Sequence, residues 1–398
     1  MAQGATGTRL TFPRTIRFMS SVTNIRAWLP LPLIASLMSC DTSSGAEPEK
    51  PRTQAYKDVG FTEFFRRTNG WVAGDGAMSV PLSDGRVLWL FGDSFVDTFD
   101  AATGTVPCLF QVRNTAMVHH KTDLRNARTL VHSNAASRTF FRFVGGEPFW
   151  YWPVNGFQEG NAVYVYLTKL KPGGGLGFET VGHAWARLHF PELSIEGYDP
   201  LPDFKGIDFG CGFVKDSDGV HTHAYGSKLV GLDSMVFVAR FKTADPGRDW
   251  RYWDGNGWTE DVAKAAVIGR GAAPSLHVCK VKNKYVLTIS ELSVRCDQGK
   301  EIYVSISERA TGPFSLRKRV FTVDDTVEGH HPFFYLPVAH PEFMDEKGDL
   351  LVTYSINGYE PCLKNCVNGR MNPDYYRPKA IRVPLELIGF GQRQDAGR

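Results

Sequence analysis

One pattern recurs five times along this chain: a turn-forming pair is followed by a short apolar strand that ends in polar or charged residues. The turns lie roughly 60 to 75 residues apart, about the length of a four-stranded blade, and a period of this size is typical of repeat architectures. The five segments are SDGRVLWLFGDSF (83–95), EGNAVYVYLTKL (159–170), SDGVHTHAYGSKL (217–229), KNKYVLTISEL (282–292) and KGDLLVTYSING (347–358).

Each segment has strand-like neighbours on both sides. A run rich in Gly and aromatic residues precedes it, and a run with period-two alternation follows it, as in TAMVHH (115–120) and EIYVSIS (301–307). No helical periodicity of convincing length is present. We therefore predict an all-β fold, a five-bladed β-propeller over residues 61–390, in which residues distant in sequence converge on one central channel.

The charge of the chain is nearly balanced. Its 45 Lys and Arg stand against 42 Asp and Glu, for a formal net charge of +3, and the basic residues are scattered. A nucleic-acid-binding protein would show a basic patch or stripe instead. We expect a monomer that binds no nucleic acid.

The N-terminal region resembles a secretory signal. Arg26 precedes the apolar run AWLPLPLIASLM, which ends at Ser39 and Cys40 and is too short for a comfortable transmembrane helix. Residues 37–40 also resemble a bacterial lipobox, which predicts cleavage before Cys40 and a lipid anchor on that thiol, although an ordinary signal peptide that contains a Cys is the alternative. Translation could start at Met19 instead, which leaves a signal of ordinary length. The expected divisions are a signal peptide (1–40), a tether (41–60), the propeller (61–390) and a tail (391–398). The expected location is the bacterial cell envelope, on the periplasmic or the outer side.

Six cysteines remain after Cys40, an even number that suits an oxidising compartment. Cys211 and Cys279 lie in predicted inner strands, where buried free thiols are expected. The other four lie in loops of blades 1, 4 and 5, which become neighbours when the ring closes. These four are Cys108, Cys296, Cys362 and Cys366. We predict disulfides among them, for example between Cys108 and the loop that holds Cys362 and Cys366.

Strand pairing predicts where carboxylates gather. In an antiparallel hairpin the turn determines which residues oppose each other, and opposed side chains emerge on the same face. The predicted opposed pairs are Asp75 with Asp93, Asp208 with Ser227, and Ser275 with Glu291. All these positions lie eight to ten residues from their turns, so the four acidic residues are expected at one end of the central channel.

Carboxylates in such a ring suit glycoside hydrolysis, which needs a base or nucleophile and a protonated acid. Glu291 follows an apolar strand, so burial would raise its pKa toward that of a general acid. Asp75 lies between two glycines and would leave room for a sugar or a water. Asp93 is an alternative base, or it only caps a turn. Asp208 is a further catalytic candidate, or its carboxylate only accepts backbone N–H hydrogen bonds at the end of a strand.

Other side chains are candidates for substrate binding. Trp71 and Trp152 could stack on sugar rings, and His277 and His340 could face the channel and bind a hydroxyl or serve only the structure. Asn155 and Asn357 complete the predicted set. The cluster WRYWDGNGW (250–258) packs between blades or forms a sugar-stacking lip. No zinc motif or phosphate-binding loop is present, so no cofactor is predicted, while a structural cation on the axis stays open.

Three segments carry a family resemblance: GWVAGDGAMSVPLSDGRVLWLFGDSF (70–95), GPF (312–314) and YLPVAHPEFMDEKGDLLVTYSIN (335–357). Over residues 61–390 the chain resembles uncharacterised bacterial lipoproteins assigned to the glycoside hydrolases. It is more distantly similar to five-bladed propellers that include endo-D-arabinanases and arabinofuranosidases. The resemblance implies hydrolysis of a polysaccharide or oligosaccharide, with arabinofuranose or galactose units among the options.

The resemblance also implies roles for particular residues. Asp75 matches the acidic residue on the first inner strand, and Glu291 is the nearest match to an acid from a later blade. The third acidic position has no match in blade 2, which offers only Asn155 and, at the turn, Glu159. A non-catalytic glycan-binding or cell-surface scaffold lipoprotein is therefore the alternative function.

Overall fold

The computed structural model describes residues 53–390, apart from 133–137, 146–147, 175–176, 232, 274, 294–295 and 359–364. The predicted signal peptide, Cys40, most of the predicted tether, Cys362 and the predicted tail lie outside the described residues. Within the described part, no helix combines the length and the apolar character needed to cross a membrane.

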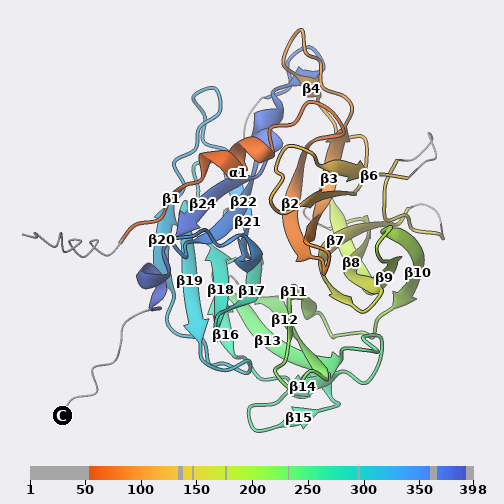
Figure 1. The fold of residues 1–398 in the computed structure, drawn as a ribbon, viewed down its shortest axis with the longest axis vertical. Coiled ribbons are helices and arrows are strands. Elements are labelled where there is room, and N and C mark those ends of the chain that lie inside the picture. The colour runs from red at the N-terminus through yellow and green to blue at the C-terminus, as the bar shows by residue number, and fades with distance from the viewer. Residues whose placement is uncertain are drawn as a thin grey trace, which may run out of the picture. The chain divides into compact units, whose positions relative to one another are not determined.

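The described strands form five antiparallel blade sheets and one small two-stranded sheet, which confirms the predicted all-β, five-bladed β-propeller (Figure 1). Blade 1 holds β2 (Trp71–Pro81), β3 (Arg86–Val96), β5 (Thr115–His120) and β6 (Arg128–Leu130). Blade 2 holds β7 (Trp150–Glu159), β8 (Ala162–Pro172), β9 (Phe178–His189) and β10 (Ser194–Pro200). Blade 3 holds β11 (Asp208–Lys215), β12 (His221–Val230), β13 (Asp233–Lys242), β14 (Arg251–Trp253), β15 (Trp258–Thr259) and β16 (Gly269–Gly271). Blade 4 holds β17 (Leu276–Val281), β18 (Lys284–Ser290), β19 (Glu301–Ser307) and β20 (Lys318–Thr322).

Blade 5 joins the two ends of the described chain. It holds β21 (Phe333–His340), β22 (Leu350–Asn357), β24 (Lys379–Val383) and, on the outside, β1 (Tyr56–Lys57). Tyr56 is the register partner of Arg382, so the segment that we expected to lie in the tether supplies the last strand of the propeller. The short helix α1 (Val59–Phe64) follows it directly.

The first strands of the blades surround the axis. β2 contacts β7, β7 contacts β11, β11 contacts β17, β17 contacts β21, and β21 returns to β2. The ends of these five strands therefore meet, which is the arrangement that brings distant residues into one site.

Turn chemistry explains the hairpins. In the blade 1 turn, the Asp84 carboxylate accepts a hydrogen bond from the backbone N–H of Arg86, and Gly85 adopts a left-handed φ of 83°. The blade 3 turn repeats this arrangement with Asp218 and Gly219. Asp and Gly favour such turns because Asp binds its own backbone and Gly tolerates positive φ.

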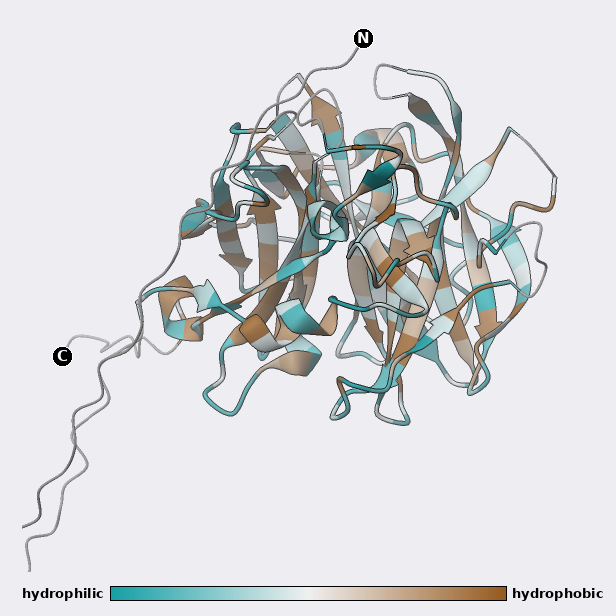
Figure 2. Ribbon diagram, turned by 90° about the horizontal axis from the view of Figure 1, so that it is seen from above, coloured by the Kyte–Doolittle hydropathy of each residue, from teal (hydrophilic) through white to brown (hydrophobic). Residues whose placement is uncertain are grey.

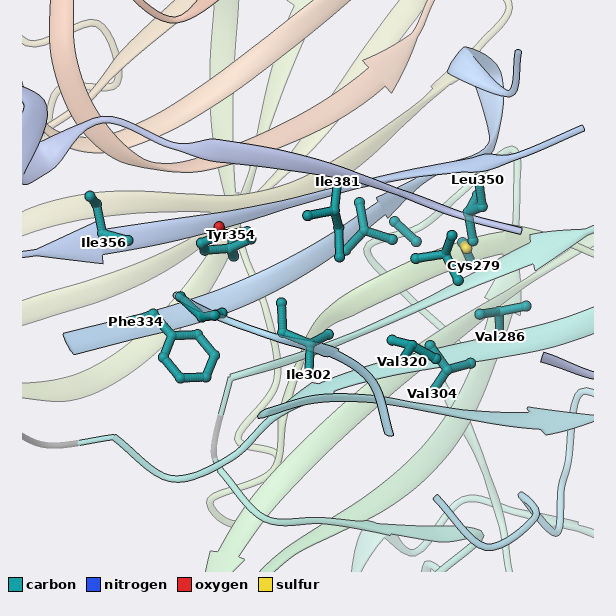
Figure 3. Packing of buried hydrophobic residues seen from close by; sticks show 14 of the residues in the cluster. Cys279, Val286, Ile302, Val304, Val320, Phe334, Leu350, Tyr354, Ile356 and Ile381 are labelled. Atoms are coloured by element: carbon teal, nitrogen blue, oxygen red, sulfur yellow. The ribbon is translucent and has the colours of Figure 1, made fainter. Parts of the chain in front are cut away.

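The hydrophobic core lies between the blades, where facing sheets interdigitate. Val286 and Ile302 of blade 4 pack in one cluster with Leu350 and Ile381 of blade 5 (Figure 3). In Figure 2, apolar colours follow the strands, and polar colours dominate many of the connecting loops. Inner strands such as β3 and β22 are buried on both faces, which is why their sequences are more continuously apolar than those of a one-sided sheet.

The disulfide prediction is confirmed for one pair. Cys108 and Cys366 are bonded, with Cα atoms 5.5 Å apart, and link blade 1 to blade 5. Beside them, β4 (Val106–Pro107) pairs with β23 (Arg370–Met371). Cys296 is also disulfide-bonded, and Cys211 and Cys279 are free and buried, as expected.

Candidate functional site

Asp75 and Asp93 lie together at one end of the blade 1 hairpin. Both belong to an irregular stretch between the Gly74–Ser94 and Gly76–Phe91 register pairs. Gly92 makes room for them, because a Cβ atom at this position would lie 2.5 Å from Oδ1 of Asp75. The motifs GDGA and FGDSF therefore place the carboxyl groups of Asp75 and Asp93 side by side.

Asp75 is held by residues of blade 5, one on β21 and one in the connection between β22 and β24. The Tyr335 hydroxyl donates to Oδ2 of Asp75 over 2.7 Å, and Tyr376 donates a second hydrogen bond. Burial raises the pKa of Asp75, while the two tyrosine hydroxyls oppose this rise. Donors aimed at a carboxylate stabilise its ionised form.

The donors around Asp93 lie farther from its carboxylate oxygens than the Tyr335 hydroxyl lies from Asp75. Trp152 Nε1 donates to its Oδ1 over 3.1 Å, and Arg113 Nη1 lies 3.5 Å from its Oδ2. Burial and then the charge of Asp75 raise the pKa of Asp93 to about 7, against the opposing effects of Trp152 and Arg113. At neutral pH the pair therefore retains a proton for part of the time, and the two groups titrate together.

Aromatic rings form the wall beside this pair. The indole of Trp152 is partly exposed and packs edge-on against Phe178, with ring centroids 4.6 Å apart. The Arg113 guanidinium lies over Trp150 at 4.2 Å and over Phe110 at 5.1 Å, which holds it beside Asp93. The site thus combines a protonatable carboxyl group with a flat apolar surface and a fixed cation.

Asp208 lies on the neighbouring blade 3 and pairs with Ser227 in the predicted register. Thr168 Oγ1 donates to its Oδ2 over 3.5 Å, and Thr168 is itself the register partner of Trp152. Blade 2 therefore connects Asp93 with Asp208. Oδ1 of Asp208 accepts from the Gly210 N–H over 3.0 Å, which is the structural role that we gave as its alternative.

Glu291 differs from the prediction in its register. Leu276 pairs with Ile289 and Val281 with Lys284, so Glu291 lies one residue beyond the position opposite Ser275. The cause is a two-residue turn in which Lys282 takes a positive φ of 52°. Oε2 of Glu291 accepts from the backbone N–H groups of Lys300 (2.9 Å) and Glu301 (3.3 Å), so this carboxylate holds the loop between β18 and β19.

Two predicted binding residues are inaccessible. Trp71 is 0% exposed and stacks on Phe91 with ring centroids 4.3 Å apart, so it serves the core rather than a sugar. Asn155 is buried, and its Oδ1 accepts from the Gly156 N–H. Sequence position alone did not separate these side chains from Trp152, which differs in facing the carboxyl pair.

The predicted histidines are also buried and satisfied. Nδ1 of His277 accepts from the Ala339 N–H, and burial lowers the pKa of His277 to about 4. His340 lies between the Ser79 hydroxyl, at 2.6 Å from Nδ1, and the Thr353 hydroxyl, at 2.8 Å from Nε2. The structure therefore favours the structural role that we gave as the alternative for both.

The remaining predicted residue, Asn357, lies beside the carboxyl pair: its Nδ2 donates to the Tyr335 hydroxyl over 3.4 Å. Sequence reasoning missed Tyr335, Tyr376 and Arg113. Tyr335 is on an inner strand and could have been proposed from its position, whereas Arg113 lies in a loop without a recognisable pattern. Within the described ranges, no three His, Cys, Asp or Glu side chains form a cluster that could hold a metal ion.

Comparison with known proteins agrees with the fold. A family described as a domain of unknown function, DUF5005, matches residues 58–388. A crystal structure from Bacteroides ovatus, of a protein provisionally named a hydrolase, superposes with a TM-score of 0.67 at 21% identity and covers 84% of this chain and 92% of its own. This likeness shows the shared fold, as the sequence resemblance implied.

Two further solved structures are more distant. A xylan β-1,4-xylosidase from Bacillus halodurans gives a TM-score of 0.44 at 11% identity and covers 79% of this chain and 53% of its own. An α-L-arabinofuranosidase from Podospora anserina gives a TM-score of 0.37 at 10% identity, and the match covers 83% of this chain and 94% of its own. Likeness at this level carries no argument about activity. No curated protein matches the chain.

Proposed function

This chain belongs to the DUF5005 family, and we propose that it is a glycoside hydrolase whose catalytic carboxyl groups are Asp75 and Asp93. The observation that carries the proposal is the adjacent pair itself, at one end of the inner hairpin of blade 1, with the pKa of Asp93 raised to about 7. Glycoside hydrolysis needs one carboxyl group protonated and one ionised near neutral pH.

The donors around the pair support a division of roles. Burial raises the pKa of Asp75, but two tyrosine hydroxyls oppose this rise by donating to its carboxylate, which suits a base or nucleophile. Asp93 keeps its proton up to about pH 7 and is the better proton donor to the glycosidic oxygen. Glu291 fits the acid role less well than expected, because its Oε2 accepts from two backbone N–H groups of the loop between β18 and β19. We keep Asp208 as a candidate for binding a sugar hydroxyl.

The substrate in this proposal is a polysaccharide or oligosaccharide that contains arabinofuranose or galactose units. The sequence resemblance supports these sugars, and Trp152 supplies a partly exposed indole for a sugar face. The lipobox-like residues 37–40 support attachment to the bacterial cell envelope through Cys40. Mass spectrometry of the protein purified from bacterial membranes would show or fail to show a lipid on that residue.

A non-catalytic glycan-binding function is the second candidate. Among the described residues of blade 2, Trp152 binds the pair and no carboxylate does so, and Arg113 occupies one side of Asp93. A degenerate site of this kind would hold a glycan without cleaving it. It predicts saturable binding without released sugar.

Product analysis separates the two candidates. The protein is incubated with arabinans, arabinogalactans, galactans and xylans, and released sugars are identified by chromatography. We expect release by the wild type and a loss of at least about 100-fold in Asp75→Asn and in Asp93→Asn, since each removes a group that transfers a proton or attacks.

Asp199→Asn is the matched control, because Asp199 is exposed on β10 of blade 2. It should retain full turnover. Wild-type turnover in both active-site variants would refute the residue assignment, and full loss in Glu291→Gln alone would return the acid role to Glu291. Glycan binding without any product would favour the binding function.

A further inference from the structure

Blade 3 carries an extra hairpin outside the four-stranded pattern. β14 and β15 add to the outer edge of β13, at the bottom of the view in Figure 1. This hairpin contains the cluster WRYWDGNGW, which the proposed catalytic site does not use. Trp253 and Trp258 are cross-strand partners on it, both partly exposed, with ring centroids 5.5 Å apart.

Basic side chains oppose each other across the same strands. His221 is the register partner of Lys242, and His223 is the partner of Arg240. Arg240 is also the partner of Arg251 on β14. Burial lowers the pKa of His223, so the like-charged partners across this ladder are Arg240 and Arg251. Like charges directly opposite one another destabilise a sheet unless a negative charge compensates them.

The acidic residues nearby compensate only part of the ladder. Glu260 lies 2.6 Å from Arg251, and Asp218 lies 2.6 Å from His221. Among the described residues, no acidic side chain forms an ion pair with Lys242 or Arg240. Lys242 and Arg240 are therefore left without an ion-pair partner among the described residues.

A cavity of about 180 Å³ lies at the centre of this ladder. It is far larger than the roughly 10–15 Å³ that one water requires. One acidic residue lines it. The lining residues are His221, Arg240, Lys242, Asp249 and Arg251.

Two buried nitrogen atoms in this region lack hydrogen-bond partners within the described protein. They are Nε of Arg240 and Nδ1 of His223, whose side chain is 3% exposed. The Arg240 guanidinium lies over the Trp258 ring at 4.5 Å, and the His223 ring lies 5.7 Å from the same indole. An unpartnered buried donor is costly, and of these two side chains only Arg240 lines the cavity, so a ligand or solvent there is most relevant to Arg240.

We propose that this cavity binds the anionic substituent of an acidic sugar, a uronate carboxylate or a sulfate ester. Arg240, Lys242 and Arg251 supply the charge-assisted donors for the anion. Trp253 and Trp258 supply the adjacent apolar surface for the sugar ring, which a free inorganic anion would not use.

The site is separate from the proposed catalytic pair. His221 begins β12, whereas Ser227, the partner of Asp208, lies six residues farther along the strand, about 20 Å away. The inference therefore does not depend on hydrolysis at Asp75 and Asp93.

Calorimetry with defined oligosaccharides tests the inference. The probes are a galacturonate oligomer, the same oligomer with its carboxyl groups reduced to neutral galactose, a sulfated galactose oligomer, and inorganic sulfate. We expect one or both acidic oligomers to bind and the neutral one not to bind. Affinity should fall as salt rises, and Lys242→Gln and Arg240→Gln should each weaken binding by about tenfold or more.

Arg187→Gln is the matched control, since Arg187 is an arginine on β9 of blade 2 that pairs with Glu196. It should bind as the wild type does. Lys242 is exposed, so its variant should fold even if Arg240→Gln does not. Trp253→Ala should weaken the binding of an acidic oligomer and leave sulfate binding unchanged, since Trp253 is partly exposed and the Arg240 guanidinium lies over Trp258 instead.

Three results would overturn the inference. They are no binding of either acidic oligomer, equal binding by wild type and the Lys242 variant, or equal affinity for inorganic sulfate and the sulfated oligomer. The last result would reduce the site to a simple anion site without sugar recognition.

Discussion

Single residues in this propeller acquire their chemistry from what surrounds them. Asp93 and Glu342 are ordinary carboxyl groups in sequence, yet burial raises the pKa of each to about 7. Asp218, exposed in a turn, changes in the other direction because His221 and backbone N–H groups bind its carboxylate, which lowers its pKa. The difference follows from solvation and from the donors that each group meets.

Gly92→Ala tests how closely the two catalytic candidates are packed. A Cβ atom would lie 2.5 Å from Oδ1 of Asp75, so the carboxyl group must move, and we expect turnover to fall at least about tenfold. Gly197→Ala is the control, because a Cβ there meets no atom within 4 Å. Turnover and circular dichroism of both variants are the measurements, and an active Gly92 variant would contradict the assignment.

Glu342→Gln tests the buried cluster in which the Ser79 hydroxyl donates to Glu342. The pKa of Glu342 is raised from 4.5 to about 7 in the folded protein, so its contribution to stability is complete below about pH 4.5 and is lost as pH rises through 7. Gln resembles the protonated form. The variant should match the wild type near pH 4 and exceed its free energy of unfolding by roughly 2–3 kcal/mol at pH 8.

Urea unfolding of both proteins at pH 4, 6 and 8 measures this difference. Other groups titrate in both proteins, among them His277, whose lowered pKa acts in the opposite direction, so only the difference between the two curves is interpreted. A difference that does not change with pH would refute the proposed titration of Glu342.

At the scale of strands and loops, turn residues decided which side chains meet. In blade 3, the register next to the turn pairs Gly212 with Tyr225, and an irregularity between Asp208 and Gly212 then produces the predicted Asp208–Ser227 pair. In blade 4, the turn displaced Glu291 by one residue. A shift of one residue reverses the face of every following side chain. The turn predicted the register next to it in blade 1, whereas the prediction failed in blade 4, where Lys282 takes an unexpected positive φ, and held in blade 3 only through an irregularity in the strand.

Removal of the Cys108–Cys366 disulfide tests the link between blades 1 and 5. The bond joins residues 258 positions apart, and its loss should lower the free energy of unfolding by about 2–4 kcal/mol. Chemical unfolding of Cys108→Ser, Cys366→Ser and the double variant measures this loss. The double variant should lose no more than either single one, since both remove the same bond; additive losses would mean that the thiols act separately.

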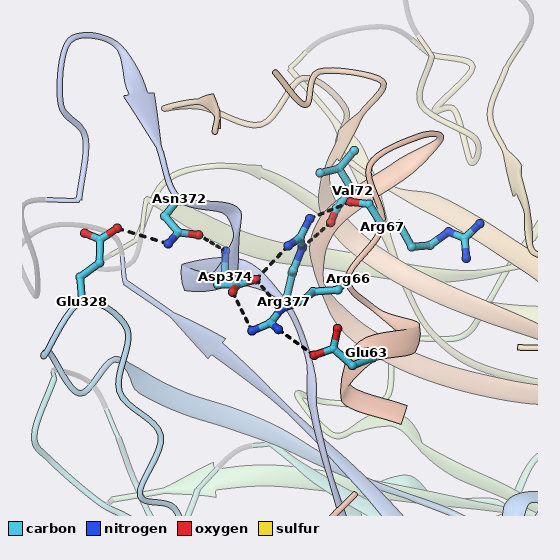
Figure 4. Close-up of polar contacts among 8 residues, drawn as sticks. All are labelled: Glu63, Arg66, Arg67, Val72, Glu328, Asn372, Asp374 and Arg377. Carbon is cyan, nitrogen blue, oxygen red and sulfur yellow. Dashed lines mark hydrogen bonds and ion pairs between the residues drawn. The ribbon is translucent and has the colours of Figure 1, made fainter. Parts of the chain in front are cut away.

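At the scale of the whole molecule, ring closure depends on contacts between the two ends of the chain. Asp58 caps α1 through the Phe61 N–H and also pairs with Arg382 of β24 at 2.6 Å. Arg377 donates to the backbone carbonyls of Val72 and Arg67, which ties the connection between β22 and β24 of blade 5 to blade 1 and the segment before it (Figure 4). These contacts hold the first and the last blade together.

Asp58→Ala should destabilise the propeller by about 3–5 kcal/mol, because it leaves the Arg382 charge buried and unpaired. Asp58→Asn keeps the helix cap and should cost less. Glu196→Ala breaks the exposed pair with Arg187 and should cost less than about 1 kcal/mol. Thermal and urea unfolding measure all three, and equal losses for Asp58→Ala and Glu196→Ala would show that the closing pair adds nothing.

The sequence by itself determined the architecture of this protein. Five repeats of turn and strand, alternation within the strands and the loop positions of Cys108 and Cys366 were enough to predict the propeller, its blade order and one disulfide. These features are local or follow from the repeat. Their physical basis, turn geometry and burial of alternate side chains, acts between residues close in the chain.

Only the tertiary structure decided which polar residues form the candidate site. Trp71 and Trp152 look equivalent in sequence, but packing buries the first and aims the second at Asp93. Tyr335 reaches Asp75 from 260 positions away, and Arg240 and Arg251 meet only because an extra hairpin pairs with β13. Burial and partner identity depend on the closed ring, and no short stretch of sequence contains that information.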